Sequence, residues 1–193
     1  NNSEVKIMWA LVESGSVSKV FARPKQLTLG DVQYPSNIFM LWSSSELEAI
    51  GIYEIVIDNS NLKDKEYYIN TDQSFSFSSG TVTATYGTAT AKPLNDSGSG
   101  DTLVKGLKTL HKEVINSGAA GRLSPTDWMV VRASEGGTAV PSSITTQRAA
   151  VRTKANAMCT QIDNAADVDA LAALYVYNNE TPPVRPLGEL PTV

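Results

Sequence analysis

Residues 74–86 read SFSFSSGTVTATY, and this stretch decides how the first half of the chain folds. Apolar and polar residues alternate on both sides of Ser78-Ser79-Gly80, and a period of two places successive side chains on opposite faces of a strand. We therefore predict a β-hairpin whose first strand turns Phe75 and Phe77 to one face. The inner side of its second strand is expected to carry Val82, Ala84 and Tyr86. Serine and threonine cover the outer face, so the sheet is half-buried and antiparallel.

Shorter strands and one short helix are expected before this hairpin. Residues 5–12 and 17–22 have the composition of strands and flank a glycine-containing turn. Ser45 is the candidate N-cap of the helix, and Glu48, three residues on, is its candidate capping-box partner. Residues 1–94 are therefore predicted to form a mostly β module with one short helix.

The spacing of apolar residues changes after residues 95–100, NDSGSG, whose glycine and serine content predicts a flexible linker. Residues 101–175 then repeat apolar side chains at helical spacing and are predicted to form a helical module. The expected buried positions are Leu103, Leu107, Leu110 and Val114, then Trp128, Met129 and Val131, then Ile144, Val151, Ala155, Met158 and Ile162. The predicted fold class is α+β, with an N-terminal mostly antiparallel β region followed by a C-terminal helical bundle.

Residues 176–193 are rich in proline, which removes backbone donors and disfavours helices and sheets. The prolines are Pro182, Pro183, Pro186 and Pro191. We expect this segment to be an extended tail, so that a chain truncated after Tyr177 keeps a folded monomer and loses contacts within an assembly.

The chain offers few groups for catalysis or metal binding. It contains one histidine, His111, and one cysteine, Cys159. His111 has no carboxylate in position to orient it, so we expect a surface histidine rather than a general base. Cys159 lies among apolar residues at helical spacing and is expected to pack as a small core residue. We therefore expect no catalytic residue, no metal site, no cofactor and no enzymatic activity.

Two arginines, Arg148 and Arg152, fall four residues apart and share a helix face. They could bind a carboxylate ligand. The alternative is a solvated face, or pairing with Asp127 and Glu135.

The charge and hydropathy of the chain bear on its partners. The net charge is -4, and no basic stretch is long enough for binding a phosphate backbone, so no nucleic-acid partner is expected. No apolar run approaches the ~18 residues that span a bilayer, so no membrane partner is expected. Charged residues make up only 19% of the chain, which fits a subunit embedded in an assembly.

Two groups of residues are candidates for an interaction surface. The first comprises the tyrosines Tyr67, Tyr68 and Tyr86 in and near the hairpin, since aromatic residues are enriched at interfaces. Strand alternation also accounts for these rings as the core of a thin domain, and both interpretations stay open. The second group comprises Pro182, Pro183 and Pro186 in the tail.

Several stretches of the chain resemble small virion structural proteins of tailed bacteriophages. WALVESGSV at 9–17, VQYP at 32–35 and WSSSELEAIGIY at 42–53 are similar to an N-terminal module of these proteins. LSPTDWMVVR at 123–132, followed by a helix with Arg148 and Arg152, looks like the helical module of tail-fibre and fibre-assembly proteins. The resemblance implies no catalytic or ligand-binding residues.

The resemblance leads us to expect a non-enzymatic structural subunit located in the virion, in its tail or fibre apparatus. Its expected partners are other virion proteins and further copies of itself in a homo-oligomer. Two alternatives are a receptor- or glycan-binding module that uses the residue 67–86 region, and a head-decoration protein that cements the capsid.

Overall fold

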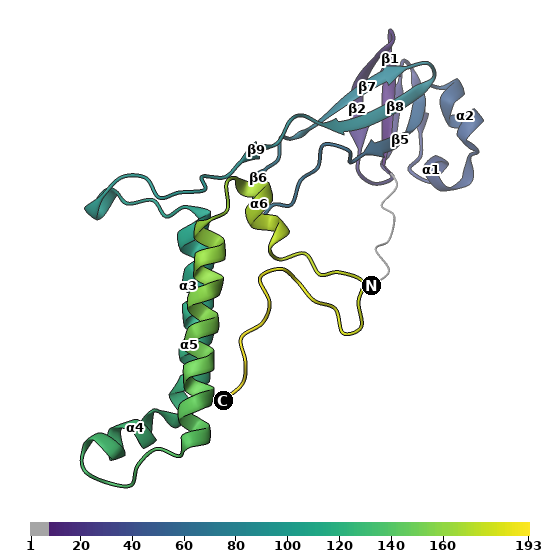
Figure 1. Cartoon of the computed structure of the whole chain (residues 1–193). Coiled ribbons are helices and arrows are strands. Elements are labelled where there is room, and N and C mark those ends of the chain that lie inside the picture. Colours follow the sequence, from purple (N-terminus) through teal and green to yellow (C-terminus); the bar gives the residue numbers. More distant parts are fainter. Residues whose placement is uncertain (1–7) are drawn as a thin grey trace. The chain divides into compact units, whose positions relative to one another are not determined.

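The computed structural model describes residues 8–193 and divides the chain into two compact units (Figure 1). The N-terminal unit ends at Thr90 and is rich in strands, and the C-terminal unit, Ala91–Val193, is rich in helices. The chain therefore has an α+β fold in which strands precede helices, as predicted. Residues 5–7 of the first predicted strand lie outside the described residues.

The N-terminal unit is built on one five-stranded sheet of order β2-β1-β5-β8-β7. Strands β5 and β8 run parallel, whereas the β1–β2, β1–β5 and β7–β8 pairs are antiparallel. The smaller ladders are β3–β4 and β6–β9. The elements are β1 (Trp9–Glu13), β2 (Ser16–Phe21), β3 (Leu27–Leu29), β4 (Val32–Tyr34), α1 (Ile38–Leu41), α2 (Ser44–Ala49), β5 (Ile52–Asp58), β6 (Tyr68–Ile69), β7 (Gln73–Ser78), β8 (Thr81–Tyr86) and β9 (Thr90–Ala91).

The predicted hairpin forms β7 and β8 in the expected register. Phe75 pairs with Ala84 and Phe77 pairs with Val82, and all four residues belong to one apolar cluster. Strands β2 and β7, first and last in the sheet order, also contact each other. The sheet therefore curls until its edges meet, and this cluster fills the inner side.

The other face of the sheet is covered by α1 and α2. Trp9 of β1 packs against Phe39 of α1 with ring centroids 5.1 Å apart, and Leu47 of α2 joins the same apolar cluster. The predicted cap was wrong by two residues. Ser43, not Ser45, is the N-cap, and its backbone N–H donates to the Glu46 carboxylate at 2.7 Å in a complete capping box. Ser43 and Ser45 each have a glutamate three residues on, Glu46 and Glu48, and the helix uses the first pair because it begins at Ser44.

The C-terminal unit contains two long helices, α3 and α5, which lie side by side in Figure 1. Near the end of α5, Asp163 ties the pair together: its carboxylate accepts from Lys112 Nζ at 2.7 Å, and its carbonyl accepts from Lys108 Nζ at 2.9 Å. The elements are the 3₁₀ turn η1 (Gly100–Thr102), α3 (Leu107–Leu123), the 3₁₀ turn η2 (Ser124–Thr126), α4 (Asp127–Ser134), α5 (Ser142–Asp163) and α6 (Val168–Ala173).

The apolar stripe predicted for the first helix is right only at Leu107, whereas that of α5 is confirmed except at Ile144, which is half-buried. α3 begins at Leu107, and its buried residues are Leu107, His111, Ile115 and Ala119, spaced by four. Leu110 and Val114 are exposed, Val114 by 69%. The buried face includes a histidine and an alanine, so the positions of the large apolar side chains did not indicate which face of α3 is buried. In α5, Val151, Ala155, Met158 and Ile162 are buried as predicted.

The predicted linker at residues 95–100 is held by hydrogen bonds. Ser97 and Val104 form an antiparallel bridge. The Asp96 carboxylate accepts from the backbone N–H of Gly106 at 2.7 Å and from the Thr109 hydroxyl at 2.9 Å. These bonds fasten the segment to the start of α3, so it forms an ordered turn within the C-terminal unit.

The proline-rich tail has no helix or strand, as predicted, but it is not an extended arm. Leu187 is 0% exposed, and its backbone N–H donates to the carbonyl of Leu174 at 3.0 Å. The Pro186 carbonyl accepts from the Gln161 side chain of α5 at 3.3 Å. The tail therefore packs on the helices and completes their core, because two helices alone leave apolar surface uncovered.

Candidate interaction surfaces

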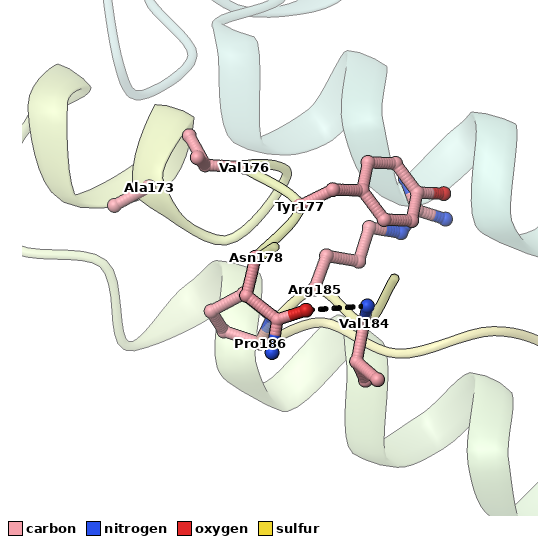
Figure 2. Close-up of a pocket in the computed structure, with 7 residues that line it drawn as sticks. All are labelled: Ala173, Val176, Tyr177, Asn178, Val184, Arg185 and Pro186. Carbon is pink, nitrogen blue, oxygen red and sulfur yellow. Dashed lines mark hydrogen bonds between the residues drawn. The ribbon is translucent and has the colours of Figure 1, made fainter. Parts of the chain in front are cut away.

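The first candidate surface is an open groove beside the tail, which involves the predicted tail residue Pro186. Its volume is about 500 Å³, and Figure 2 shows the side chains around it. They come from the end of α6 and from the tail. The lining residues are Ala173, Val176, Tyr177, Asn178, Val184, Arg185 and Pro186.

A hydrogen-bonded turn shapes one side of this groove. The backbone N–H of Asn178 donates to the Val184 carbonyl at 2.8 Å. The Val184 N–H donates to the Asn178 side-chain oxygen at 2.9 Å, the bond drawn as a dashed line in Figure 2. The same oxygen accepts from the Glu180 N–H at 3.2 Å. An asparagine that closes a turn in this way holds an irregular segment in one shape. Pro182 and Pro183 lie exposed within the turn.

The charged groups at the groove neutralise each other. The Arg185 guanidinium lies 5.3 Å from the Tyr175 ring centroid and 5.4 Å from that of Tyr177. It pairs with the Glu189 carboxylate at 2.7 Å, and Tyr177 donates a hydrogen bond to the same carboxylate at 2.6 Å. This hydrogen bond lowers the pKa of Glu189, where the Arg185 charge acts in the same direction, and it raises the pKa of Tyr177. The groove is therefore apolar and electrically balanced at neutral pH.

A second candidate surface is α4, and here the sequence prediction was wrong. Trp128 and Val131 were expected to face the core, but none of the eight residues of α4 is buried. Trp128 is 55% exposed, and Val130 and Val131 are exposed beside it. The Arg132 guanidinium lies 4.9 Å from the Trp128 ring centroid. The helix thus presents an aromatic residue, an arginine and two valines to solvent.

The structure places the three predicted interface tyrosines in different environments. Tyr67 is 6% exposed and belongs to the interior, so the core interpretation holds for this residue and the surface interpretation does not. Tyr68 and Tyr86 are half-buried. The Lys63 ammonium lies 5.7 Å from the centroid of the Tyr68 ring. Of the three predicted tyrosines, Tyr68 and Tyr86 are therefore the ones accessible enough to contribute to a contact.

His111 is buried rather than on the surface, which corrects the prediction. Its ring lies 4.8 Å from that of Tyr175, between centroids. Tyr175 follows α6 and covers the face of α3 on which His111 stands, a contact that spacing along the chain does not reveal. The histidine therefore has a packing role.

Arg148 is engaged by its own chain. Its guanidinium donates to the Leu123 carbonyl at 2.7 Å, to the Thr126 hydroxyl at 2.6 Å and to the Asp127 carboxylate at 2.7 Å. The predicted pairing with Asp127 is confirmed, and Arg148 clamps the corner between α3 and α4. Arg152 is exposed and lines a small cavity of about 260 Å³ beside it. The two arginines therefore do not act together as a carboxylate clamp.

Cys159 is half-buried, and burial raises the pKa of its thiol. A raised pKa leaves little thiolate, the reactive form, at neutral pH. Among residues 8–193 no group of three or more histidine, cysteine, aspartate or glutamate side chains could hold a metal ion. No helix in the described part of the chain is long and apolar enough to cross a membrane.

Sequence reasoning identified Pro186, which lines the groove, but missed the other lining residues. Val176, Tyr177 and Arg185 lie in an irregular segment, where no period assigns a side chain to a face. The one local feature of the sequence that pointed to this region was the spacing of four residues between Arg185 and Glu189, which form an ion pair.

No protein-family model matches this chain, and no curated protein or solved structure matches it either.

Proposed function

We propose that this chain is a non-enzymatic structural subunit of a bacteriophage virion, part of the tail or fibre apparatus, which docks to other virion proteins. The observation that carries the docking role is α4, with Trp128, Val130 and Val131 exposed to solvent. Trp128 and Val131, three residues apart, share one face of α4, and exposed apolar side chains that lie together mark protein contacts. Tryptophan and arginine are the residues that most often dominate binding energy at such contacts. The virion assignment rests on the resemblance of residues 9–17 and 123–132.

We also propose that the helical bundle is completed between subunits of a homo-oligomer. Leu110 and Val114 of α3 are exposed along one edge of its buried stripe. Helices from further copies would remove these side chains from water, and each buried CH₂ group contributes roughly 0.8 kcal/mol.

Light scattering across a concentration series tests the docking role of α4. We expect a stable trimer or hexamer that Trp128→Ala weakens, because the substitution removes the largest apolar side chain of α4. Val104→Ala is the matched control, since Val104 is exposed elsewhere in the same unit. An oligomer that both variants leave unchanged would contradict the assignment of α4 to the interface.

The virion assignment needs a separate measurement. The chain is expressed from its native genetic setting, and particles are purified on a density gradient and probed with an antibody. Recovery with the particles, at many copies each, supports the proposal. Recovery in the soluble fraction alone contradicts it. The position of the antibody label on the particle separates a tail or fibre subunit from a head-decoration protein.

A receptor- or glycan-binding module is the second candidate function. The half-buried Tyr68 ring with Lys63 beside it favours this alternative, because sugars stack on partly exposed aromatic rings that have polar neighbours. A glycan array with Tyr68→Ala and Tyr86→Ala as controls tests it. Glycan binding that both substitutions abolish would support the receptor-binding role over a purely structural one.

A further inference from the structure

We propose that the groove lined by Val176, Tyr177 and Val184 receives the Pro182-Pro183 segment of a second copy of this chain. The contact is reciprocal, so that each copy inserts its prolines into the groove of the other. This inference rests on the proposed structural role and names one of the self-contacts through which the subunit assembles.

The groove suits an uncharged segment. Its one cation, Arg185, is already paired with Glu189 at 2.7 Å and lies against two tyrosine rings. A charged occupant would therefore lose water without gaining a partner. Val176 is 65% exposed, and Tyr177 and Val184 are exposed beside it. An apolar occupant would shield all three.

Proline is well matched to such a groove. It carries no backbone N–H, so its burial leaves no donor unsatisfied. Proline-rich segments dock on grooves lined by aromatic side chains, and their stiff backbone loses little entropy on binding. Tyr177 supplies the aromatic wall, and Pro186 adds a further apolar ring.

The chain itself presents such a segment in a fixed shape. Asn178 closes the turn through its bonds with Val184 and Glu180, at 2.8, 2.9 and 3.2 Å. Pro182 and Pro183 stand exposed on this turn and do not fill the groove of their own chain. A preorganised segment of this kind binds without the cost of ordering a loop.

The groove and the exposed prolines lie on the same short stretch, residues 173–186. A two-fold axis beside this stretch would bring each groove to the prolines of the other copy, as an isologous interface requires. A different partner would have to supply a proline segment that this chain already carries. The contact is small by the standards of specific interfaces, so we expect it to be weak in dilute solution and populated at high concentration.

Cysteine cross-linking captures a weak contact of this kind. Cys159 is the only cysteine, so a Cys159→Ala background carries one new cysteine per chain. We mix chains carrying Pro183→Cys with mass-tagged chains carrying Val176→Cys and follow the mixed disulfide under mild oxidation. Both positions are exposed, so the fold should tolerate the changes, and circular dichroism verifies this.

The control replaces Val176→Cys with Val104→Cys, an exposed valine outside the groove. Docking raises the local thiol concentration, so we expect the Pro183–Val176 pair to cross-link roughly tenfold faster than the control pair. Addition of Val184→Asp to both chains should bring the rate down to that of the control, because it places a charge in the groove. Equal rates for the two pairs would overturn the proposal.

A synthetic peptide of residues 179–185 tests for a different occupant. Peptide binding, followed by NMR shifts of the Val176 and Val184 methyl groups, together with equal cross-linking rates, overturns the self-contact and assigns the groove to a proline segment of another protein. An oligomer in solution with equal rates also overturns it and leaves the structural role intact. Absence of the chain from virion particles contradicts the virion assignment whatever the cross-linking result.

Discussion

The tail of this chain belongs to the core of the C-terminal unit, and Leu187→Ala tests this directly. Leu187 is 0% exposed, and its backbone N–H bonds to the Leu174 carbonyl at 3.0 Å. The substitution removes buried methyl groups while the backbone bond remains. An extended arm would make the same substitution silent.

The expected magnitude follows from burial. Leucine-to-alanine changes at buried positions cost about 2–5 kcal/mol, because a cavity is added to the lost transfer free energy. A loss of roughly 3 kcal/mol lowers the melting temperature of a unit of about 100 residues by roughly 12–24 °C. A typical domain has only about 5–15 kcal/mol of unfolding free energy, so the variant should be visibly weakened and still folded in the cold.

Urea denaturation followed by circular dichroism at the helical band is the appropriate assay, because α3 and α5 dominate that signal. Leu103→Ala is the matched control, since Leu103 is exposed in the same unit and its loss should cost under about 1 kcal/mol. Truncation after Tyr177 should destabilise the unit at least as much as Leu187→Ala. If Leu187→Ala and the truncation both unfold at the wild-type urea concentration, the tail is an arm and the reasoning is refuted.

Three further predictions concern single contacts. Arg148→Met should lower the free energy of unfolding by about 1–3 kcal/mol, because it removes the ion pair with Asp127 and two further hydrogen bonds from a buried corner. Urea denaturation measures this free energy, and an unchanged value would show that the Arg148 contacts do not stabilise the fold. Gly51→Ala should destabilise the N-terminal unit clearly more than Gly30→Ala. Both glycines have positive φ, but a Cβ at Gly51 would lie 2.9 Å from a backbone oxygen of β1, whereas a Cβ at Gly30 would meet no atom within 4 Å. Similar melting temperatures for the two variants would contradict this prediction. The lowered pKa of Glu189 means that its carboxylate stabilises the fold above the unfolded pKa of about 4.3 and loses this effect as the pH falls through the folded value. The difference in unfolding free energy between wild type and Glu189→Gln should therefore be present at pH 7 and disappear below about pH 4. A difference that does not depend on pH would refute the assignment.

The elements that local patterns describe well were predicted correctly. The β7–β8 hairpin follows from strict alternation, and its register brings Phe77 opposite Val82. The stripe of α5 follows from Val151, Met158 and their neighbours at helical spacing. In both cases one face is buried against a single neighbouring layer, so the period along the chain reports the burial.

The candidate surfaces were predicted less well, for a common physical reason. α4 has the composition of a core helix, yet Trp128 is exposed, because nothing in the C-terminal unit covers it. His111 has the composition of a surface residue, yet Tyr175 covers it at 4.8 Å. The type of a residue indicates whether its side chain favours burial or solvent. The residues that bury it come from a distant part of the chain or from another molecule, so local sequence does not reveal them.

The amino-acid sequence by itself determined the α+β class, the order of strands before helices and the buried stripe of α5. These depend on side-chain periodicity, turn residues and caps, all of which act over a few neighbouring residues. Tertiary structure alone decided that the tail packs through Leu187, that the groove forms beside Tyr177 and that α4 is left exposed. Each of these depends on which elements contact each other in space. Such contacts join residues far apart in the chain, so they produce no periodic pattern in the sequence.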